Sequence, residues 1–222
     1  MQTFTLNDGN KIPAVGFGTF QITAEGSTYK AVKEALALGY RHIDTAAAYF
    51  NEKEVGQAVR ESGISRDEIF VTSKLWLQDY AYEEAKKAID RSLLKLNLEY
   101  IDLYLIHQPY GKVAEAWRAM EEAKNDGKIS SIGVSNMTVK LWNRYADCFS
   151  VMPAVNQVEY HPMMQQQELC ILMKQKNVLI EAWAPLYEAN KDLLENDMLR
   201  GIASGHHKTV AQVVLRFENQ IR

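Results

Sequence analysis

The sequence has few cysteines, and their placement limits what they could do. Cys148 and Cys170 are the only two in 222 residues, and neither lies in a CxxC pair or beside histidines at zinc-binding spacing. A disulfide-stapled fold is therefore excluded, and no metal site is predicted. We interpret both residues as small core or surface thiols.

The sequence also has no dense run of lysine and arginine and no long apolar run. With a net charge of -3, it has no basic surface that would favour nucleic acid or an acidic membrane as a partner. No apolar run is long enough to span a bilayer, and the start lacks the features of a secretory signal. The expected location is the cytoplasm.

No linker and no shift of composition divides the chain. Apolar residues make up 47% and charged residues 24% of the sequence, proportions typical of a globular protein rather than a disordered one. We therefore expect residues 1–222 to form a single domain.

Strand-like and helix-like segments alternate along the chain. An Asp8-Gly9 turn predicts an N-terminal hairpin, and Asp79 is the expected N-cap of a long helix. The expected strands are mostly apolar rather than alternating, which indicates an α/β fold with a covered parallel sheet. Their number and spacing favour a TIM-type (β/α)8 barrel. The expected strands are 15–20, a short strand ending at Asp44, 69–74, 101–107, 129–134, 154–160 and 178–183.

The final part of the sequence predicts a helix but no eighth strand. Val210, Val213, Val214 and Phe217 have helical spacing, and the sequence stops at Arg222. The expected barrel is therefore incomplete at its C-terminal end and lacks the eighth strand and last helix. Its open edges would be covered by a partner, another protomer or further residues of a longer chain.

Polar and aromatic residues follow the ends of the predicted strands, where active sites of such barrels lie. Asp44, Tyr49, Lys74 and His107 could together protonate a carbonyl oxygen. Tyr49 would donate the proton, Lys74 would lower the pKa of the phenol, Asp44 would orient Lys74, and His107 would hold the substrate oxygen. Taken singly, each has a structural alternative, such as a helix cap or a packing residue. Their convergence on one rim favours a catalytic site.

The run from Gly39 to Gly56 resembles the signature of the aldo-keto reductase family, with Glu52 and Val55 in place. Asp44, Tyr49, Lys74 and His107 match that family's catalytic tetrad. The similarity extends from the Leu6–Gly9 hairpin to about Phe217. It looks closest to bacterial reductases of small carbonyl compounds, such as the 2,5-diketo-gluconate reductases.

This resemblance implies an oxidoreductase that transfers a hydride from NADPH to the carbonyl of an aldehyde or ketone. It implies a small carbonyl substrate and a monomer, although open barrel edges could also pair in an oligomer. Gly16-x-Gly18 is not a Rossmann fingerprint, because Gln21 occupies the third glycine position. The implied cofactor contacts are Gly18, Thr19, Asp44, Ser135, Asn136, Gln157, Trp183 and Leu186, and the implied substrate contacts are Phe20, Tyr49, Trp76 and His107.

The end of the sequence departs from the family pattern. The family's last strand carries an Ile-Pro-Lys-Ser-like segment that binds the 2′-phosphate of NADPH, and this segment is not visible in the sequence. Two functions therefore stay open. The chain is either a carbonyl reductase or a truncated barrel with weak or no cofactor binding that serves as an inactive binding or assembly module.

Overall fold

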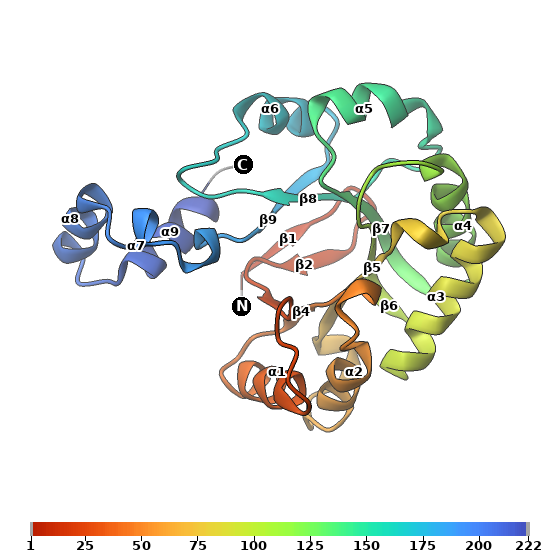
Figure 1. The fold of residues 1–222 in the computed structure, drawn as a ribbon, viewed down its shortest axis with the longest axis horizontal. Helices are drawn as coiled ribbons and strands as arrows, with labels where there is room; N and C mark the ends of the chain where they lie inside the picture. Colours follow the sequence, from red (N-terminus) through yellow and green to blue (C-terminus); the bar gives the residue numbers. More distant parts are fainter. Residues whose placement is uncertain (1, 221–222) are drawn as a thin grey trace.

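Seven parallel strands form one curved sheet in chain order, and an antiparallel hairpin lies against it (Figure 1). The computed structural model describes residues 2–220. The predicted seven-stranded, nearly closed barrel is confirmed. The hairpin strands are β1 (Thr3–Thr5) and β2 (Lys11–Pro13); the barrel strands are β3 (Phe17–Gly18), β4 (His42–Asp44), β5 (Phe70–Leu75), β6 (Ile101–Ile106), β7 (Ile129–Ser135), β8 (Val155–Glu159) and β9 (Leu179–Trp183).

Helices α1 to α6 lie around the outside of the strands, and α7 to α9 follow β9 (Figure 1). Both faces of the sheet are covered, so every residue of β5 is buried, which explains its continuous apolar and small-residue character. The helices are α1 (Ser27–Ala37), α2 (Glu52–Arg60), α3 (Tyr82–Leu96), α4 (Val113–Asn125), α5 (Val139–Tyr145), α6 (Gln167–Gln175), α7 (Lys191–Leu194), α8 (Asp197–Gly205) and α9 (Val210–Glu218).

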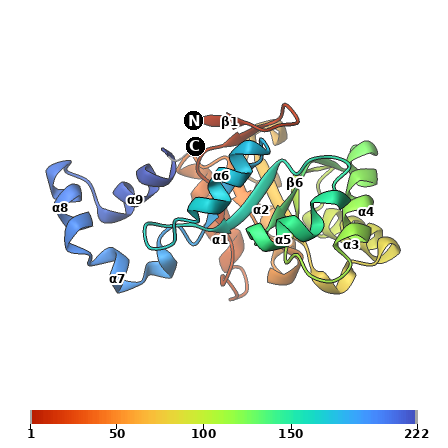
Figure 2. The same ribbon diagram turned by 90° about the horizontal axis from the view of Figure 1, so that it is seen from above.

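The hairpin closes the end of the barrel where the strands begin. Leu6 and Ile12 pack in one apolar cluster with Leu103 and Val155, near the starts of β6 and β8. The Asn7 side chain donates a 2.8 Å hydrogen bond to the Pro153 carbonyl. Figure 2 shows the hairpin on one side of the molecule, across the strands. The opposite end of the barrel is therefore the one left for a site.

Strands β3 and β9 stand at the two ends of the strand order. Beyond β9, α7, α8 and α9 extend to one side of the barrel in both views (Figures 1 and 2). Helix α9 corresponds to the helix predicted from the spacing of Val210 to Phe217. At its start, the side chains of Thr209 and Gln212 each accept a hydrogen bond from the other residue's backbone N–H. Helices α7 and α8 were not predicted.

Two sequence-based expectations are wrong in detail. Asp79 does not cap α3, because its carboxylate pairs with Arg91 at 2.9 Å and Ala81 occupies the N-cap position. The first barrel strand contains only Phe17 and Gly18, the two residues that pair with β4. Within residues 2–220, no helix combines the length and apolar character that crossing a bilayer requires.

Candidate active site

The structure brings the four predicted catalytic residues together. Asp44 ends β4, Tyr49 ends the short 3-10 helix Ala47–Tyr49, Lys74 lies near the end of β5, and His107 directly follows β6. Strands β4, β5 and β6 are parallel neighbours, so their carboxyl ends share one rim of the barrel. This is the end opposite the hairpin.

Lys74 is fully buried and uses all three hydrogens of its ammonium group. Its Nζ donates to Asp44 Oδ1 at 2.5 Å, to the Thr45 carbonyl at 3.1 Å and to the Tyr49 hydroxyl at 3.3 Å. Because an ammonium cannot accept, the Tyr49 oxygen must be the acceptor in that last bond. The phenolic hydrogen of Tyr49 is therefore left to point to another acceptor.

Burial of this group favours a protonated phenol. Burial acts to lower the pKa of Lys74, but the Asp44 carboxylate and the Tyr49 oxygen outweigh it and raise that pKa. Burial raises the pKa of Tyr49 above its usual value, although Lys74 opposes this. Lys74 acts to lower the phenol pKa, as the sequence-based expectation has it, but desolvation of the phenolate is the larger effect and the net pKa is raised. The phenol of Tyr49 therefore stays protonated at neutral pH.

His107 lies between the Tyr49 and Trp76 rings, with centroid distances of 5.6 and 4.9 Å. Burial first, and then the charge of Lys74, lower the pKa of His107 to about 4. The imidazole is therefore neutral at neutral pH and can form a hydrogen bond to a substrate oxygen without competing for the proton.

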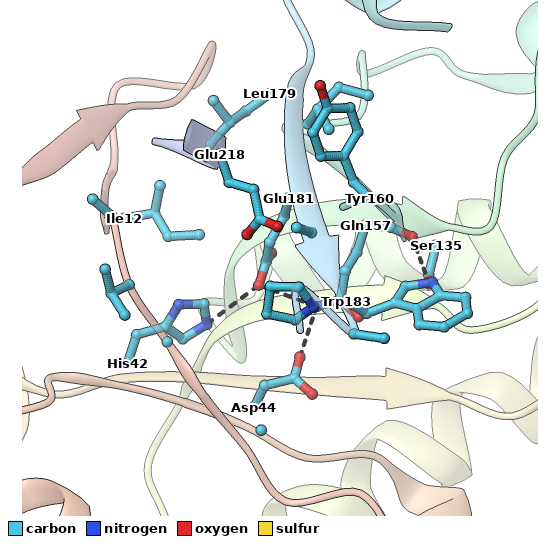
Figure 3. Close-up of a pocket in the computed structure, with 18 of the residues that line it drawn as sticks. Ile12, His42, Asp44, Ser135, Gln157, Tyr160, Leu179, Glu181, Trp183 and Glu218 are labelled. Atoms are coloured by element: carbon cyan, nitrogen blue, oxygen red, sulfur yellow. Dashed lines mark hydrogen bonds and ion pairs between the residues drawn. The ribbon is translucent and has the colours of Figure 1, made fainter. Parts of the chain in front are cut away.

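A cavity of about 1240 Å³ opens beside these residues. Figure 3 shows part of its wall, with side chains from β4, β8 and β9 pointing inward. Most of the residues that the sequence assigned to substrate and cofactor share this wall. They are Gly18, Phe20, Asp44, Tyr49, Trp76, His107, Ser135, Asn136, Gln157 and Trp183.

Hydrogen bonds hold the polar part of this wall in place. The Trp183 indole donates to Asn136 Oδ1 at 2.9 Å, and Asn136 Nδ2 donates to the His107 carbonyl at 3.1 Å. The Ser135 hydroxyl donates to the Gln157 carbonyl at 2.9 Å. The flat indole of Trp183 is thus fixed in orientation beside three residues that carry hydroxyl or amide groups.

Two predicted cofactor contacts lie elsewhere. Thr19 is fully buried, and its hydroxyl donates to the Asp44 carbonyl at 3.0 Å, so it supports the end of β4. Leu186 is partly buried in the loop after β9. Neither residue belongs to the described cavity wall.

Sequence reasoning missed Glu181 and Asn51. Glu181 lies within β9 and accepts a 3.1 Å hydrogen bond from Gln157 Nε2. Asn51 accepts from the Thr45 hydroxyl at 2.7 Å and donates to the Thr19 carbonyl at 2.9 Å, which ties the loops after β3 and β4 together. The available signal for Glu181 was a carboxylate in the middle of an apolar strand, which requires a buried partner.

Of the two cysteines, Cys170 lies in the cavity wall and Cys148 does not. Both are free and partly buried, and burial raises the pKa of each thiol. A raised pKa reduces the thiolate fraction that a nucleophile needs.

Comparisons with known proteins agree with this geometry. Residues 14–220 match the sequence profile of the Aldo/keto reductase family. The chain is 44% identical over 219 residues to a glyoxal reductase of Bacillus subtilis, covering 98% of this chain and 79% of the relative. It is 40% identical over 215 residues to methylglyoxal reductase DkgA of Escherichia coli, covering 96% and 77%. A crystal structure of an aldo/keto reductase from Brucella melitensis superposes with a TM-score of 0.90 at 46% identity, covering 97% of this chain and 83% of that one.

Proposed function

Because the chain belongs to the aldo/keto reductase family, we propose that it is a carbonyl reductase that uses NADPH and protonates the substrate oxygen with Tyr49. The observation that carries the proposal is the buried Lys74 ammonium, which donates to both Asp44 and Tyr49. Burial keeps Tyr49 protonated, and because its oxygen accepts the bond from Lys74, its own hydrogen is free to be donated.

The cavity supports a nicotinamide cofactor. The fixed indole of Trp183 offers a flat surface, and Ser135, Asn136 and Gln157 beside it offer hydroxyl and amide groups. These residues fit an aromatic ring that carries a carboxamide, and they would hold it at the polar end of the cavity. When bound, NADPH would supply the hydride that the carbonyl carbon accepts.

The chain's own residues would then direct the substrate. Neutral His107 would form a hydrogen bond to the carbonyl oxygen and Tyr49 would donate its proton to it, while Lys74 remains charged through Asp44. Phe20 lies 5.0 Å from the Tyr49 ring and Trp76 4.9 Å from the His107 ring, so two aromatic side chains would border the substrate. The names of the Bacillus and Escherichia relatives point to 2-oxoaldehydes such as methylglyoxal.

The test compares the unaltered protein with Tyr49→Phe. Tyr49→Phe removes only the hydroxyl, so we expect methylglyoxal-dependent oxidation of NADPH to fall by at least about 100-fold, the usual contribution of a general acid. Circular dichroism and the dissociation constant for NADPH should stay unchanged. Turnover by Tyr49→Phe at the original rate would contradict the role of Tyr49. No NADPH binding by the unaltered protein would favour the inactive binding module instead.

A further inference from the structure

The side-chain amide of Gln157 is held between two carboxylates. Its Nε2 donates to Asp44 Oδ2 at 2.8 Å and to Glu181 Oε1 at 3.1 Å. Figure 3 shows these contacts as a continuous line from Asp44 through Gln157 to Glu181, and on to His42. The Gln157 side chain is buried and reaches across the barrel from β8 to β4.

The two neighbouring carboxylates show which end of the Gln157 side-chain amide is the nitrogen. If the amide were turned round, its oxygen would face two carboxylate oxygens at hydrogen-bond distance, where acceptors meet acceptors. The observed orientation instead matches two N–H donors with two acceptors. Both hydrogens of Nε2 are then used, and the only group that Gln157 has left for a ligand is its oxygen.

Glu181 is placed for this contact by the sheet itself. Gln157 and Glu181 are direct partners in the parallel pairing of β8 with β9, so their side chains emerge side by side on the same face. The Glu181 side chain is 18% exposed, and His42 Nε2 lies 3.9 Å from its carboxylate. Burial, and next the charge of Asp44, raise the pKa of Glu181. Burial of an acid costs free energy, and the bond from Gln157 at 3.1 Å is shorter than the 3.9 Å contact with His42.

We propose that Glu181 is a positioning residue that determines cofactor specificity. By accepting one N–H of Gln157, it leaves the amide only an acceptor to present, so the site selects a ring substituent that donates a hydrogen bond. This inference rests on the proposed function, since the ring in question is that of the nicotinamide cofactor. Without Glu181, the bond to Asp44 alone fixes the Nε2 end, so the whole side-chain amide is freer to turn and present an N–H to the ligand.

The test compares two cofactors that differ in whether the substituent on the nicotinamide ring can donate a hydrogen bond. NADP⁺ carries a carboxamide, whereas its 3-acetylpyridine analogue carries a methyl ketone with an acceptor but no donor. Dissociation constants for both are measured by quenching of tryptophan fluorescence, without any turnover. We expect the unaltered protein to bind NADP⁺ about tenfold more tightly than the analogue, the usual effect of one hydrogen bond to a buried group.

Three variants separate positioning from a merely structural role. Glu181→Met removes the acceptor and should reduce the preference to about threefold or less. Glu181→Gln keeps an acceptor without the charge and should retain the tenfold preference. Glu159→Met makes the same change on the neighbouring strand, where the carboxylate pairs with His161 rather than Gln157, and should also retain it.

The outcomes distinguish this inference from the proposed function. An unchanged preference in Glu181→Met, or no preference in the unaltered protein, overturns the role of Glu181 and leaves the reductase proposal standing. If Glu181→Met does not fold, loss of the preference in Glu181→Gln would equally overturn it. No binding of NADP⁺ by the unaltered protein overturns the proposed function, and this inference with it.

Discussion

Lys74 is the residue that joins the parts of the site, because its three donors go to Asp44, Thr45 and Tyr49. A buried cation is costly unless it is paired and hydrogen-bonded, and here both conditions are met. The carboxylate of Asp44 is the partner that keeps Lys74 charged. Burial raises the pKa of Tyr49 and so keeps it protonated, whereas Lys74 acts to lower that pKa.

These pKa directions predict the pH dependence of activity. The pKa values of Lys74 and Tyr49 are both raised, so the protonated form of the site persists well above neutral pH. The pKa of His107 is about 4, so the imidazole stays neutral down to that region. We expect His107 to cause no fall in kcat/KM for methylglyoxal above about pH 5, and we expect the alkaline fall to begin only where Lys74 and Tyr49 lose their protons.

The pH dependence of kcat/KM in Asp44→Asn can be compared with that of the unaltered protein. Loss of the carboxylate removes the main opposition to desolvation of Lys74, so the ammonium should lose its proton at lower pH. The alkaline fall in kcat/KM should move to lower pH by about one unit or more. An alkaline limb at the same pH in both proteins would show that Asp44 does not control Lys74.

Individual site residues could be predicted only where a polar or ionisable side chain lies at the end of a predicted strand. Asp44, Lys74 and His107 each follow or end an apolar strand, and the strands bring them to one rim. Glu181 was missed because its role depends on the strand register that sets it beside Gln157. The net rise in the pKa of Tyr49 was missed because burial depends on the assembled cavity.

At the scale of elements, helix α2 follows the tyrosine loop and packs closely on the end of α3. A Cβ on Gly56 would lie 1.8 Å from the Leu96 carbonyl oxygen, an impossible contact. Four residues later, Arg60 donates to the same oxygen. Gly56 therefore allows the backbones of α2 and α3 to approach, which fixes the loop that carries Tyr49.

Gly56→Ala should accordingly destabilise the protein. Because the clash is with backbone, α2 must move away from α3, and we expect a loss of about 2 kcal/mol or more in the free energy of unfolding. The matched control is Gly201→Ala in α8, where an added Cβ meets nothing within 4 Å. That change should be neutral or stabilise by up to about 1 kcal/mol. Equal urea midpoints for the two variants would contradict the close approach.

Helices were predicted best where apolar residues recur at helical spacing. The long helix α3 was expected from its buried residues Ala85, Ala88, Ile89 and Leu96, and the structure confirms it. The loop after β9 was not predictable, because Ala184, Tyr187, Glu188 and Ala189 adopt left-handed backbone conformations that non-glycine residues rarely choose. Such conformations are imposed by tertiary contacts, which local sequence does not encode.

At the scale of the whole molecule, the barrel interior holds a buried histidine that links several strands. His42 on β4 is 1% exposed, hydrogen-bonds Thr72 on β5 at 2.8 Å and lies 3.9 Å from Glu181 on β9. Burial lowers its pKa from 6.5 to about 4; Asp44 opposes this shift and Lys74 adds to it. Protonation of His42 therefore opposes the folded barrel.

The sign of the effect on stability follows from linkage. Between about pH 6.5 and pH 4 the unfolded chain binds a proton at His42 that the folded protein does not, so stability is full above 6.5 and falls as the pH drops towards 4. The loss attributable to His42 is on the order of 3 kcal/mol. His42→Gln should flatten the dependence of the urea midpoint on pH in this range. The exposed His206→Gln should leave the slope unchanged, and a slope unaltered in His42→Gln would contradict this account.

The proposed reaction of this seven-stranded barrel is the reduction of a carbonyl with a hydride from NADPH, with Tyr49 supplying the proton. The most direct measurement is the mass of the alcohol formed from methylglyoxal with NADPH deuterated on its transferable position. We expect the alcohol to carry one deuterium on the former carbonyl carbon. Tyr49→Phe should give at most about one hundredth of the original yield of this labelled alcohol. An alcohol without deuterium, or no alcohol at all, would contradict it.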